Sequence, residues 1–395
     1  MKWEKVKLGE LYEVHNGLSK AGKFFGEGYP FLTFSTVFNN YFIPKQITDL
    51  VQSTEKEQES YSIRRGDVFV TRTSETSDEL GMSCVALKDY PMATYNGFTK
   101  RMRPITNRVF PEYIGYYMRL PSFRGEFRAF STMTTRASLR NEDLLGLEVK
   151  LPSIEIQKQI ADILSAYDDL IENNQKQIKL LEEAAQRLYK EWFVDLRFPG
   201  HEKTKILDGM PEGWNEKTLS QVADVIMGQS PKSEFYNSEK KGLPFHQGVG
   251  SYGVRFVMDD IYSTSYTRIA EPNSILFSVR APVGRLNITK NKVVIGRGLA
   301  AINQADGCQS YLYYLLKNRF FKDNIVGNGS IFASVSKDEL LNQKFLIPER
   351  NLMMQFEKIV SQMDKQIENL DSKNKKLIEA RDRLLPKLMS GEVEV

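Results

Sequence analysis

Apolar residues recur at alternating steps of three and four through the middle of the chain. In an α-helix this spacing places the side chains along one face, as in the seam of a coiled coil. The pattern predicts one long amphipathic helix whose seam is interrupted at Asn174. The repeating positions are Ile160, Ile163, Tyr167, Ile171, Ile178, Leu181, Ala185, Leu188 and Trp192.

The same pattern occurs again near the C-terminal end. Aligning Leu151 with Ile347 without a gap brings identical residues together, including Pro152 with Pro348, Asp168 with Asp364, and Leu188 with Leu384. A second long helix is therefore predicted. Pro386 should end or kink this helix early, because proline lacks the backbone N–H that an interior turn needs.

The repeat continues, more weakly, into the segments that precede the two helices. "GDVFVTR" (66–72) resembles "NSILFSV" (273–279), and such apolar runs behind turn residues predict strands. "EYIGYYMRL" and "SYLYYLLKN" predict a pair of matching helices. The chain therefore contains an internal repeat, and each copy is a domain of mixed helix and strand followed by a long helix.

Length and composition place the chain among globular proteins. Its 395 residues predict two or three domains, and 41% apolar residues suffice for ordinary cores. The two cysteines form no C-x-x-C pair and the three histidines are scattered, so neither disulfides nor a zinc site are expected. No run predicts a membrane span or a signal peptide, and a cytoplasmic location is therefore expected.

Basic residues concentrate in two tracts, although the net charge is only +4. Between 100 and 140, nine lysines and arginines accompany two acidic residues, and between 268 and 297, six accompany one. Each tract has aromatic residues nearby, a pattern typical of a phosphate-binding surface. Solvated helix faces are the alternative interpretation of the same charges.

Common catalytic motifs are missing from the sequence. It has no G-x-x-x-x-G-K-[ST] loop, no G-x-G-x-x-G between a strand and a helix, and no Asn-Pro-Pro-aromatic tetrapeptide of amino-methyltransferases. Asp143, Glu148 and Lys150 have the spacing of a nuclease metal site, but Glu148 aligns with Lys344 in the second copy. Glu148 is therefore interpreted as a solvent-facing strand residue, and neither a catalytic residue nor a metal site is predicted.

The repeated segments resemble the specificity subunits of type I restriction-modification enzymes. The most specific pieces are "LPSIEIQKQIADILSAYDDLIENNQKQIKLLEEAAQRLYKEWFVDLRFPG", "IPERNLMMQFEKIVSQMDKQIENLDSKNKKLIEARDRLL" and "ILFSVRAPVG". The resemblance implies an α+β fold whose two long helices form an antiparallel coiled coil with a pseudo-twofold axis. Its parts would be target recognition domains 1 and 2 (1–150 and 214–346), two spacer helices (151–197 and 347–395) and a connector (198–213).

The resemblance also implies a function and partners. The chain would be the non-catalytic subunit that binds a bipartite target in double-stranded DNA. It would join two modification (methyltransferase) subunits and, in the full complex, restriction subunits, in host defence by DNA methylation and cleavage. S-adenosylmethionine, ATP and Mg²⁺ would be held by those partners. Related domains on one face of B-DNA should read half-sites about one helical turn apart, and the half-sites should differ because the two copies differ.

Two other classes of protein compete with this interpretation. A single-chain DNA nuclease or methyltransferase with its own recognition domains is one, and the missing motifs count against it. A purely structural coiled-coil scaffold is the other, and salt-dependent DNA binding would exclude it.

Ten residues of the basic tracts are predicted to contact DNA. The fork of arginine suits guanine edges, whereas lysine more often neutralises phosphate. Arg119, Arg124 and Arg128 are left out because an exposed helix face would explain them. The candidates are Lys100, Arg101, Arg103, Arg136, Arg140, Arg280, Arg285, Lys290, Lys292 and Arg297.

Apolar residues off the helix seam predict a surface for the modification subunits. For Trp192 and Phe193, packing against the adjoining domain is an equal alternative. The candidates are Leu164, Leu170, Trp192 and Phe193.

Asn174 and Asn374 are predicted to face each other. Asn174 lies three residues after Ile171 and Asn374 four after Leu370, which places them in layers that oppose each other in an antiparallel pair. A paired amide would fix the register of the helices, whereas an unpaired buried amide would cost about 1–3 kcal/mol. The alternative is that each points to solvent.

Overall fold

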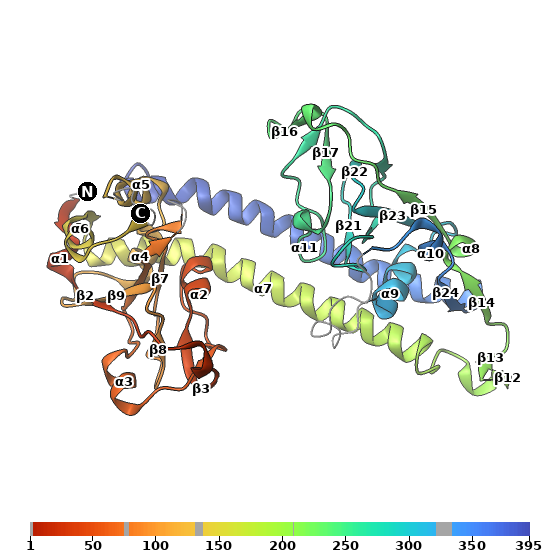
Figure 1. The fold of residues 1–395 in the computed structure, drawn as a ribbon, viewed down its shortest axis with the longest axis horizontal. Coiled ribbons are helices and arrows are strands. Elements are labelled where there is room, and N and C mark those ends of the chain that lie inside the picture. The colour runs from red at the N-terminus through yellow and green to blue at the C-terminus, as the bar shows by residue number, and fades with distance from the viewer. Residues whose placement is uncertain (1–2, 75–78, 131–136, 208, 321–333) are drawn as a thin grey trace. The chain divides into compact units, whose positions relative to one another are not determined.

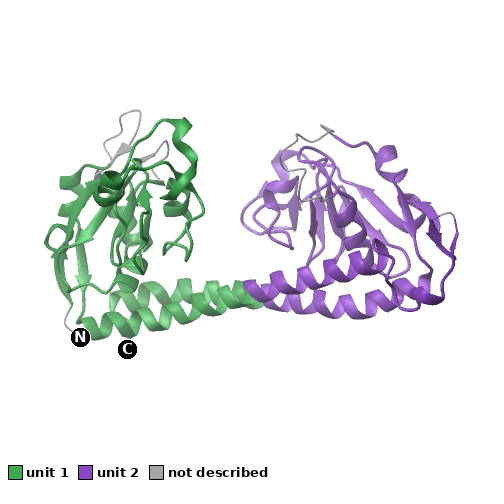
Figure 2. Ribbon diagram, turned by 90° about the horizontal axis from the view of Figure 1, so that it is seen from below, with its two compact units in different colours: residues 1–174, 372–395 green, residues 175–371 purple. Residues whose placement is uncertain are grey.

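The structure is a computed structural model that describes residues 3–74, 79–130, 137–207, 209–320 and 334–395 (Figure 1). The chain divides into two compact units. Unit 1 contains residues 1–174 and 372–395, and unit 2 contains residues 175–371 (Figure 2). Each unit therefore combines one globular copy of the repeat with part of both long helices.

Unit 1 is built on a four-stranded antiparallel sheet in the order β2–β9–β5–β7. A three-stranded sheet, β4–β3–β8, pairs β3 with β8 in parallel, and β1 pairs with β11 just before α7. All four residues of β5 are buried, and the first three are apolar, because β5 is an interior strand covered on both faces. The strands are β1 (Glu4–Lys7), β2 (Tyr12–Asn16), β3 (Phe25–Leu32), β4 (Leu50–Val51), β5 (Val68–Thr71), β6 (Thr73–Ser74), β7 (Ser83–Val85), β8 (Thr94–Tyr95), β9 (Thr99–Pro104), β10 (Ala137–Ser138) and β11 (Glu148–Leu151).

Short helices cover the sheets of unit 1. Residues 112–117 of the segment "EYIGYYMRL" lie in α4, and Tyr113, Ile114 and Tyr116 are fully buried in the core. The helices are α1 (Leu8–Leu11), α2 (Phe34–Asn39), α3 (Glu55–Ser60), α4 (Pro111–Tyr117), α5 (Pro121–Phe130) and α6 (Asn141–Gly146).

Unit 2 repeats this plan. A four-stranded sheet, β15–β23–β20–β21, corresponds to the main sheet of unit 1, and β14 pairs with β24 just before α11. A five-stranded sheet, β16–β18–β17–β22–β19, again contains one parallel pair, β17 with β22. The strands are β14 (Asn215–Thr218), β15 (Ala223–Met227), β16 (Tyr236–Asn237), β17 (Leu243–His246), β18 (Tyr262–Ser263), β19 (Ile269–Ala270), β20 (Ile275–Ser278), β21 (Leu286–Ile288), β22 (Val293–Ile295), β23 (Leu299–Gln304) and β24 (Lys344–Ile347).

Unit 2 also contains a hairpin and short α-helices. The hairpin, β12 (Ile206–Leu207) with β13 (Met210–Pro211), lies in the predicted connector, and "SYLYYLLKN" lies in α9 as the repeat predicts. The helices are α8 (Leu219–Val222), α9 (Gln309–Phe320) and α10 (Lys337–Leu341).

The two long helices are where the apolar pattern predicts them. Helix α7 spans Ile154–Phe193 and α11 spans Arg350–Ser390. Because α11 continues through Pro386, the prediction that this proline ends the helix early is wrong, and the alternative, a kink, stays a prediction. Proline removes one N–H bond, and the neighbouring Leu385, Leu388 and Met389 are buried in the core of unit 1, which holds the last turns in helical form.

Within each unit, α7 and α11 pack antiparallel. From contact to contact, residue numbers rise along one helix as they fall along the other. In unit 1 the pairs are Asp168 with Arg381 and Asn174 with Asn374; in unit 2, Arg255 joins Glu182 to Asp364, and Trp192 packs on Phe356.

Candidate nucleic-acid interface

A hollow of about 200 Å³ in unit 2 brings together two of the predicted arginines. Arg280 follows β20, and Arg297 lies in the turn between β22 and β23; both are exposed. Gln247, which follows β17, is exposed beside them and lines the same hollow. Three side chains with forked or paired hydrogen-bond donors therefore surround one concave surface.

Glycines bring the backbone segments of this hollow close together. A Cβ on Gly298 would lie 2.4 Å from the carbonyl oxygen of Gln247, so a larger residue there would push the two segments apart. The backbone N–H of Gly296 donates to the carbonyl of His246 at 2.8 Å, and the N–H of Arg297 donates to Ser230 Oγ at 3.2 Å. The backbone that carries Arg297 is thus fixed from both sides.

A buried histidine fixes the segment that carries Gln247. His246 is fully buried, with its Nδ1 2.8 Å from Ser251 Oγ and its Nε2 3.1 Å from Asp259 Oδ1. These residue types form hydrolytic triads elsewhere, but a ring closed to solvent cannot meet a substrate. We interpret the trio as a brace for residues 247–252. Residues 248–253 have G-x-G-x-x-G spacing, but a short 3₁₀ turn follows β17 instead of an α-helix.

Unit 1 has a larger hollow, of about 530 Å³, at the corresponding edge of its main sheet. Arg72 directly follows β5, at the position that Val279 occupies after β20, and Arg140 precedes α6 with its side chain 70% exposed. Lys100 lies at the floor, 5% exposed, with its ammonium donating to Asn141 Oδ1. Burial lowers the pKa of Lys100 and the charge of Arg72 lowers it further, while Asp143 opposes the shift.

Arg101 and Arg103 do not lie on this surface, and their prediction as DNA contacts is corrected. Arg101 is 3% exposed and donates to the carbonyl of Ser62 at 2.7 Å, and Arg103 forms a two-bond ion pair with buried Asp67 at 2.6 and 2.8 Å. Both arginines belong to β9, an interior strand with neighbours on each side. A basic run in an interior strand is held by internal partners.

The lysines of the second tract also form ion pairs. Lys290 donates to Asp371 of α11 at 2.7 Å and lies over the ring of Phe256. It therefore connects the globular part of unit 2 to the long helix. Its prediction as a DNA contact is corrected as well. Lys292 is half exposed and pairs with Glu271 at 3.0 Å. Arg136 lies outside the described residues.

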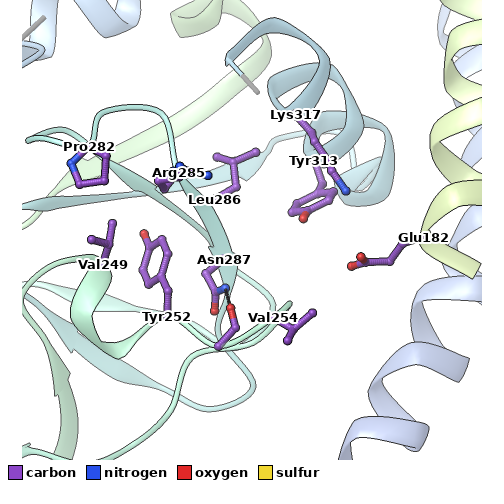
Figure 3. Close-up of a pocket in the computed structure, with 11 residues that line it drawn as sticks. Glu182, Val249, Tyr252, Val254, Pro282, Arg285, Leu286, Asn287, Tyr313 and Lys317 are labelled. Atoms are coloured by element: carbon purple, nitrogen blue, oxygen red, sulfur yellow. Dashed lines mark hydrogen bonds between the residues drawn. The ribbon is translucent and has the colours of Figure 1, made fainter. Parts of the chain in front are cut away.

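Arg285 lines a different pocket, of about 410 Å³ (Figure 3). Tyr313 and Lys317 from α9 and Glu182 from α7 line it too. Beside it, buried Arg255 stacks 3.6 Å from the ring of Tyr313 and pairs with Asp364 at 2.6 Å. This pocket therefore extends to where the globular part of unit 2 meets its helices. It adjoins the hollow of Arg280 and Arg297, because Val249 lines both.

The predicted partner surface is largely internal. Leu164 is fully buried in the core of unit 1, so its prediction as a partner residue is corrected. Trp192 and Phe193 belong to the core of unit 2, which agrees with the alternative that they pack against the adjoining domain. The aromatic side chains pack against Phe356 because the adjoining helix and domain cover them. Leu170 is 51% exposed and stays available to a partner.

The two seam asparagines lie within hydrogen-bonding distance. Asn174 Nδ2 donates to Asn374 Oδ1 at 2.8 Å, and Asn374 Nδ2 points to the carbonyl of Ile171 at 3.5 Å. Both are buried. This is the geometry that the heptad positions predict; its role in fixing register stays a prediction.

Arg72, Asn16 and Gln247 line the hollows and were missed by sequence reasoning. Arg72 ends the segment "GDVFVTR", so its place just after a predicted strand was an available signal. Gln247 and Asn16 lie in neither basic tract, and nothing in their local sequence marks them.

Metal sites and membrane spans are also not found in the part of the chain that the structure describes. Among those residues, no cluster of three His, Cys, Asp or Glu side chains could hold a metal ion. No described helix is long and apolar enough to cross a membrane.

Two related α+β units, each with an arginine-lined hollow, define the chain as a duplicated recognition protein. Comparison with known families agrees: a model described as the type I restriction modification DNA specificity domain matches residues 1–183 and 211–380. The chain belongs to this family.

Similar proteins span the full length of the chain. A putative type I restriction enzyme MjaX specificity subunit from Methanocaldococcus jannaschii is 28% identical, covering 100% of this chain and 94% of its own. The type I restriction enzyme HindI specificity subunit from Haemophilus influenzae is 23% identical over 99% of both chains. A crystal structure of a type I restriction-modification S subunit from M. genitalium covers 98% of this chain and 96% of its own, with a TM-score of 0.59 and 19% identity, and shows the same fold.

Proposed function

We propose that this chain is the DNA specificity subunit of a type I restriction-modification system. The observation that carries the proposal is the pair of hollows at corresponding sheet edges, lined by Arg72 and Arg140 in unit 1 and by Arg280 and Arg297 in unit 2. Arginines around a concave surface suit both phosphates and guanine edges, and Arg140, Arg280 and Arg297 are exposed. Two such surfaces suit a bipartite target in double-stranded DNA.

The chain supplies recognition, and its partners supply the reaction. Two modification (methyltransferase) subunits join it, one for each copy of the repeat, and restriction subunits join in the full complex. Those partners hold S-adenosylmethionine, ATP and Mg²⁺. Exposed apolar residues such as Leu170 on α7 support a partner surface on the long helices. The DNA that it reads lies in the cytoplasm, its expected location.

The long helices act as a spacer between the two recognition domains, 1–150 and 214–346. We propose that they form an antiparallel coiled coil and relate the two repeats by a pseudo-twofold axis. The antiparallel contacts within each unit and the Asn174–Asn374 pair support this arrangement. A target with two different half-sites and an uncontacted spacer follows.

The test is methylome sequencing of a host that carries the chain together with its modification subunit. We expect one bipartite methylated motif that is absent when the chain is omitted. Methylation without a bipartite motif would contradict the proposal. Modification or cleavage of plasmid by the purified chain alone, with S-adenosylmethionine or Mg²⁺, would favour the single-chain enzyme instead.

A further inference from the structure

The same turn precedes the long central strand of each unit. In unit 1 it is Asn96–Gly97–Phe98, between β8 and β9, and in unit 2 it is Gly296–Arg297–Gly298, between β22 and β23. We call these the reading turns. Each follows the strand that pairs in parallel and leads into the strand that borders the hollow, so each is held at the same place in its unit.

The two turns share one set of backbone hydrogen bonds. In unit 1, the N–H of Asn96 donates to Leu32, Thr99 to Asn96, and Arg72 to Phe98, each at 3.0 Å. Unit 2 has the corresponding bonds. The N–H of Gly296 donates to the carbonyl of His246 at 2.8 Å, that of Leu299 to Gly296 at 3.0 Å, and that of Val279 to Gly298 at 2.9 Å. The backbone is therefore a fixed scaffold with its bonds satisfied internally.

The side chains on this scaffold differ in kind and in position, because Phe98 corresponds to Gly298 and Arg297 corresponds to Gly97. Unit 1 presents the ring of Phe98, 59% exposed, and unit 2 presents the guanidinium of Arg297, also exposed. The bonded backbone of the turn needs neither group. Removing the aromatic ring of Phe98 from water by contact with DNA would be favourable, because burial of apolar surface lowers the free energy.

The surroundings of each side chain agree with a role against DNA. Phe98 accepts a backbone bond from Arg72, which lines the hollow of unit 1 with Arg140. Arg297 shares the hollow of unit 2 with Arg280 and Gln247. Each reading turn therefore lies among groups that suit phosphates and base edges.

We propose that each reading turn selects the base at one position of its half-site, by hydrogen bonds in unit 2 and by an apolar contact in unit 1. Arg297 reads the O6 and N7 acceptors of a guanine through its fork, and Phe98 packs against the 5-methyl group of a thymine. This inference rests on the proposed function. It names which bases the two units select and adds Phe98, which lies in neither basic tract.

The first test uses the full chain with its modification subunits and DNA that carries the methylome-derived motif. Arg297→Ala should lower discrimination for one guanine by roughly 10- to 100-fold and leave the other half-site unchanged. Arg297→Lys should keep overall affinity but lose the discrimination, because lysine keeps the charge without the fork. Replacing that guanine by 7-deazaguanine, which lacks N7, should weaken DNA binding by the native protein but not by the Ala variant.

The second test removes the methyl group alone. Deoxyuridine in place of one thymidine should weaken binding by native protein roughly 3- to 10-fold, and Phe98→Ala should bind both DNAs equally. Met92→Ala, at another exposed apolar residue of unit 1, and Lys241→Ala, at a surface lysine of unit 2, serve as matched controls. Neither control should change the motif.

The outcomes separate this inference from the proposed function. Absence of a bipartite motif with the native chain contradicts the proposed function. A bipartite motif that stays unchanged in both variants overturns only the reading turns. Uniform loss of affinity on all sequences would assign Arg297 to phosphate, and changes in the same half-site for both variants would also overturn the inference.

Discussion

Asp67 is fully buried and accepts two hydrogen bonds from the guanidinium of Arg103. Replacing the carboxylate by an amide leaves a largely buried cation without its counterion. We expect Asp67→Asn to lower the free energy of unfolding by about 3–5 kcal/mol, measured by chemical denaturation. Asp143→Asn is the control, because its partner Arg140 is mostly exposed, and it should cost less than about 1 kcal/mol. Equal losses would show that the buried pair has no special role.

Local sequence could not separate the arginines that line hollows from those that are internal. Arg101 and Arg103 lie in a strongly basic run of the sequence. Arg103 nevertheless forms an ion pair with Asp67, which directly precedes β5. That pairing depends on β5 lying beside β9, which is a tertiary fact. Arg280 and Arg297 were chosen by the same criterion, a place in a basic tract, and they line a hollow because they lie next to strand ends, where side chains leave the sheet.

Salt dependence gives a second prediction for a single residue. Arg280 is exposed at the rim of the hollow in unit 2. If it contacts a phosphate, Arg280→Ala should reduce the slope of log affinity against log salt by about 1 and weaken binding similarly on all sequences. Fluorescence anisotropy over a salt series measures this slope. A changed base preference with an unchanged slope would assign Arg280 to a base instead.

At the level of elements, the asparagine pair should behave as a coupled unit. Asn374→Leu leaves the amide of Asn174 without its partner and should cost about 1–3 kcal/mol. The double variant Asn174→Leu with Asn374→Leu should recover most of this loss, because no polar group is then left unpaired. A double-mutant cycle in urea measures the coupling. Additive losses would mean that the pair does not interact.

Pro386 allows a prediction about the end of α11. Its ring removes one N–H from a helix that nevertheless continues to Ser390. Pro386→Ala should restore that bond and raise the free energy of unfolding by about 1–3 kcal/mol. Calorimetry would show a higher Tm for the transition that involves unit 1. Lys387→Ala, at the next and half-exposed position, should leave Tm almost unchanged. A lower Tm for Pro386→Ala would mean that the proline fits a bend that the end of the helix requires.

Periodicity predicted the elements that have strong repeats. The two long helices, the strands within 66–72 and 273–279, and the paired helices in the globular copies all follow from it. Two-residue strands such as β16 and β18 are too short to have a period, and their pairing is made by partners distant in sequence. The error at Pro386 arose because a local rule was applied without the packing that overrides it.

For the whole molecule, the duplication predicts how many partners bind. Because each half contains a domain and a long helix, we expect two modification subunits per chain. Native mass spectrometry with saturating modification subunit should give this ratio. Leu170→Glu, at an exposed position on α7, should weaken the association at least tenfold, whereas Leu164→Glu should disrupt folding because that side chain is buried. One bound subunit at saturation would contradict the predicted ratio.

The division of the chain between its two units also sets the order in which the protein can fold on the ribosome. Unit 2 is a single uninterrupted stretch, residues 175–371, whereas unit 1 needs residues 372–395 as well as the first 174. Leu385, Leu388 and Met389 lie in the core of unit 1, so this core is complete only after these residues have been synthesised. At roughly 5–20 residues per second this delay lasts on the order of 10–40 s. During that time the start of the chain is exposed to chaperones and proteases, although unit 2 can already fold.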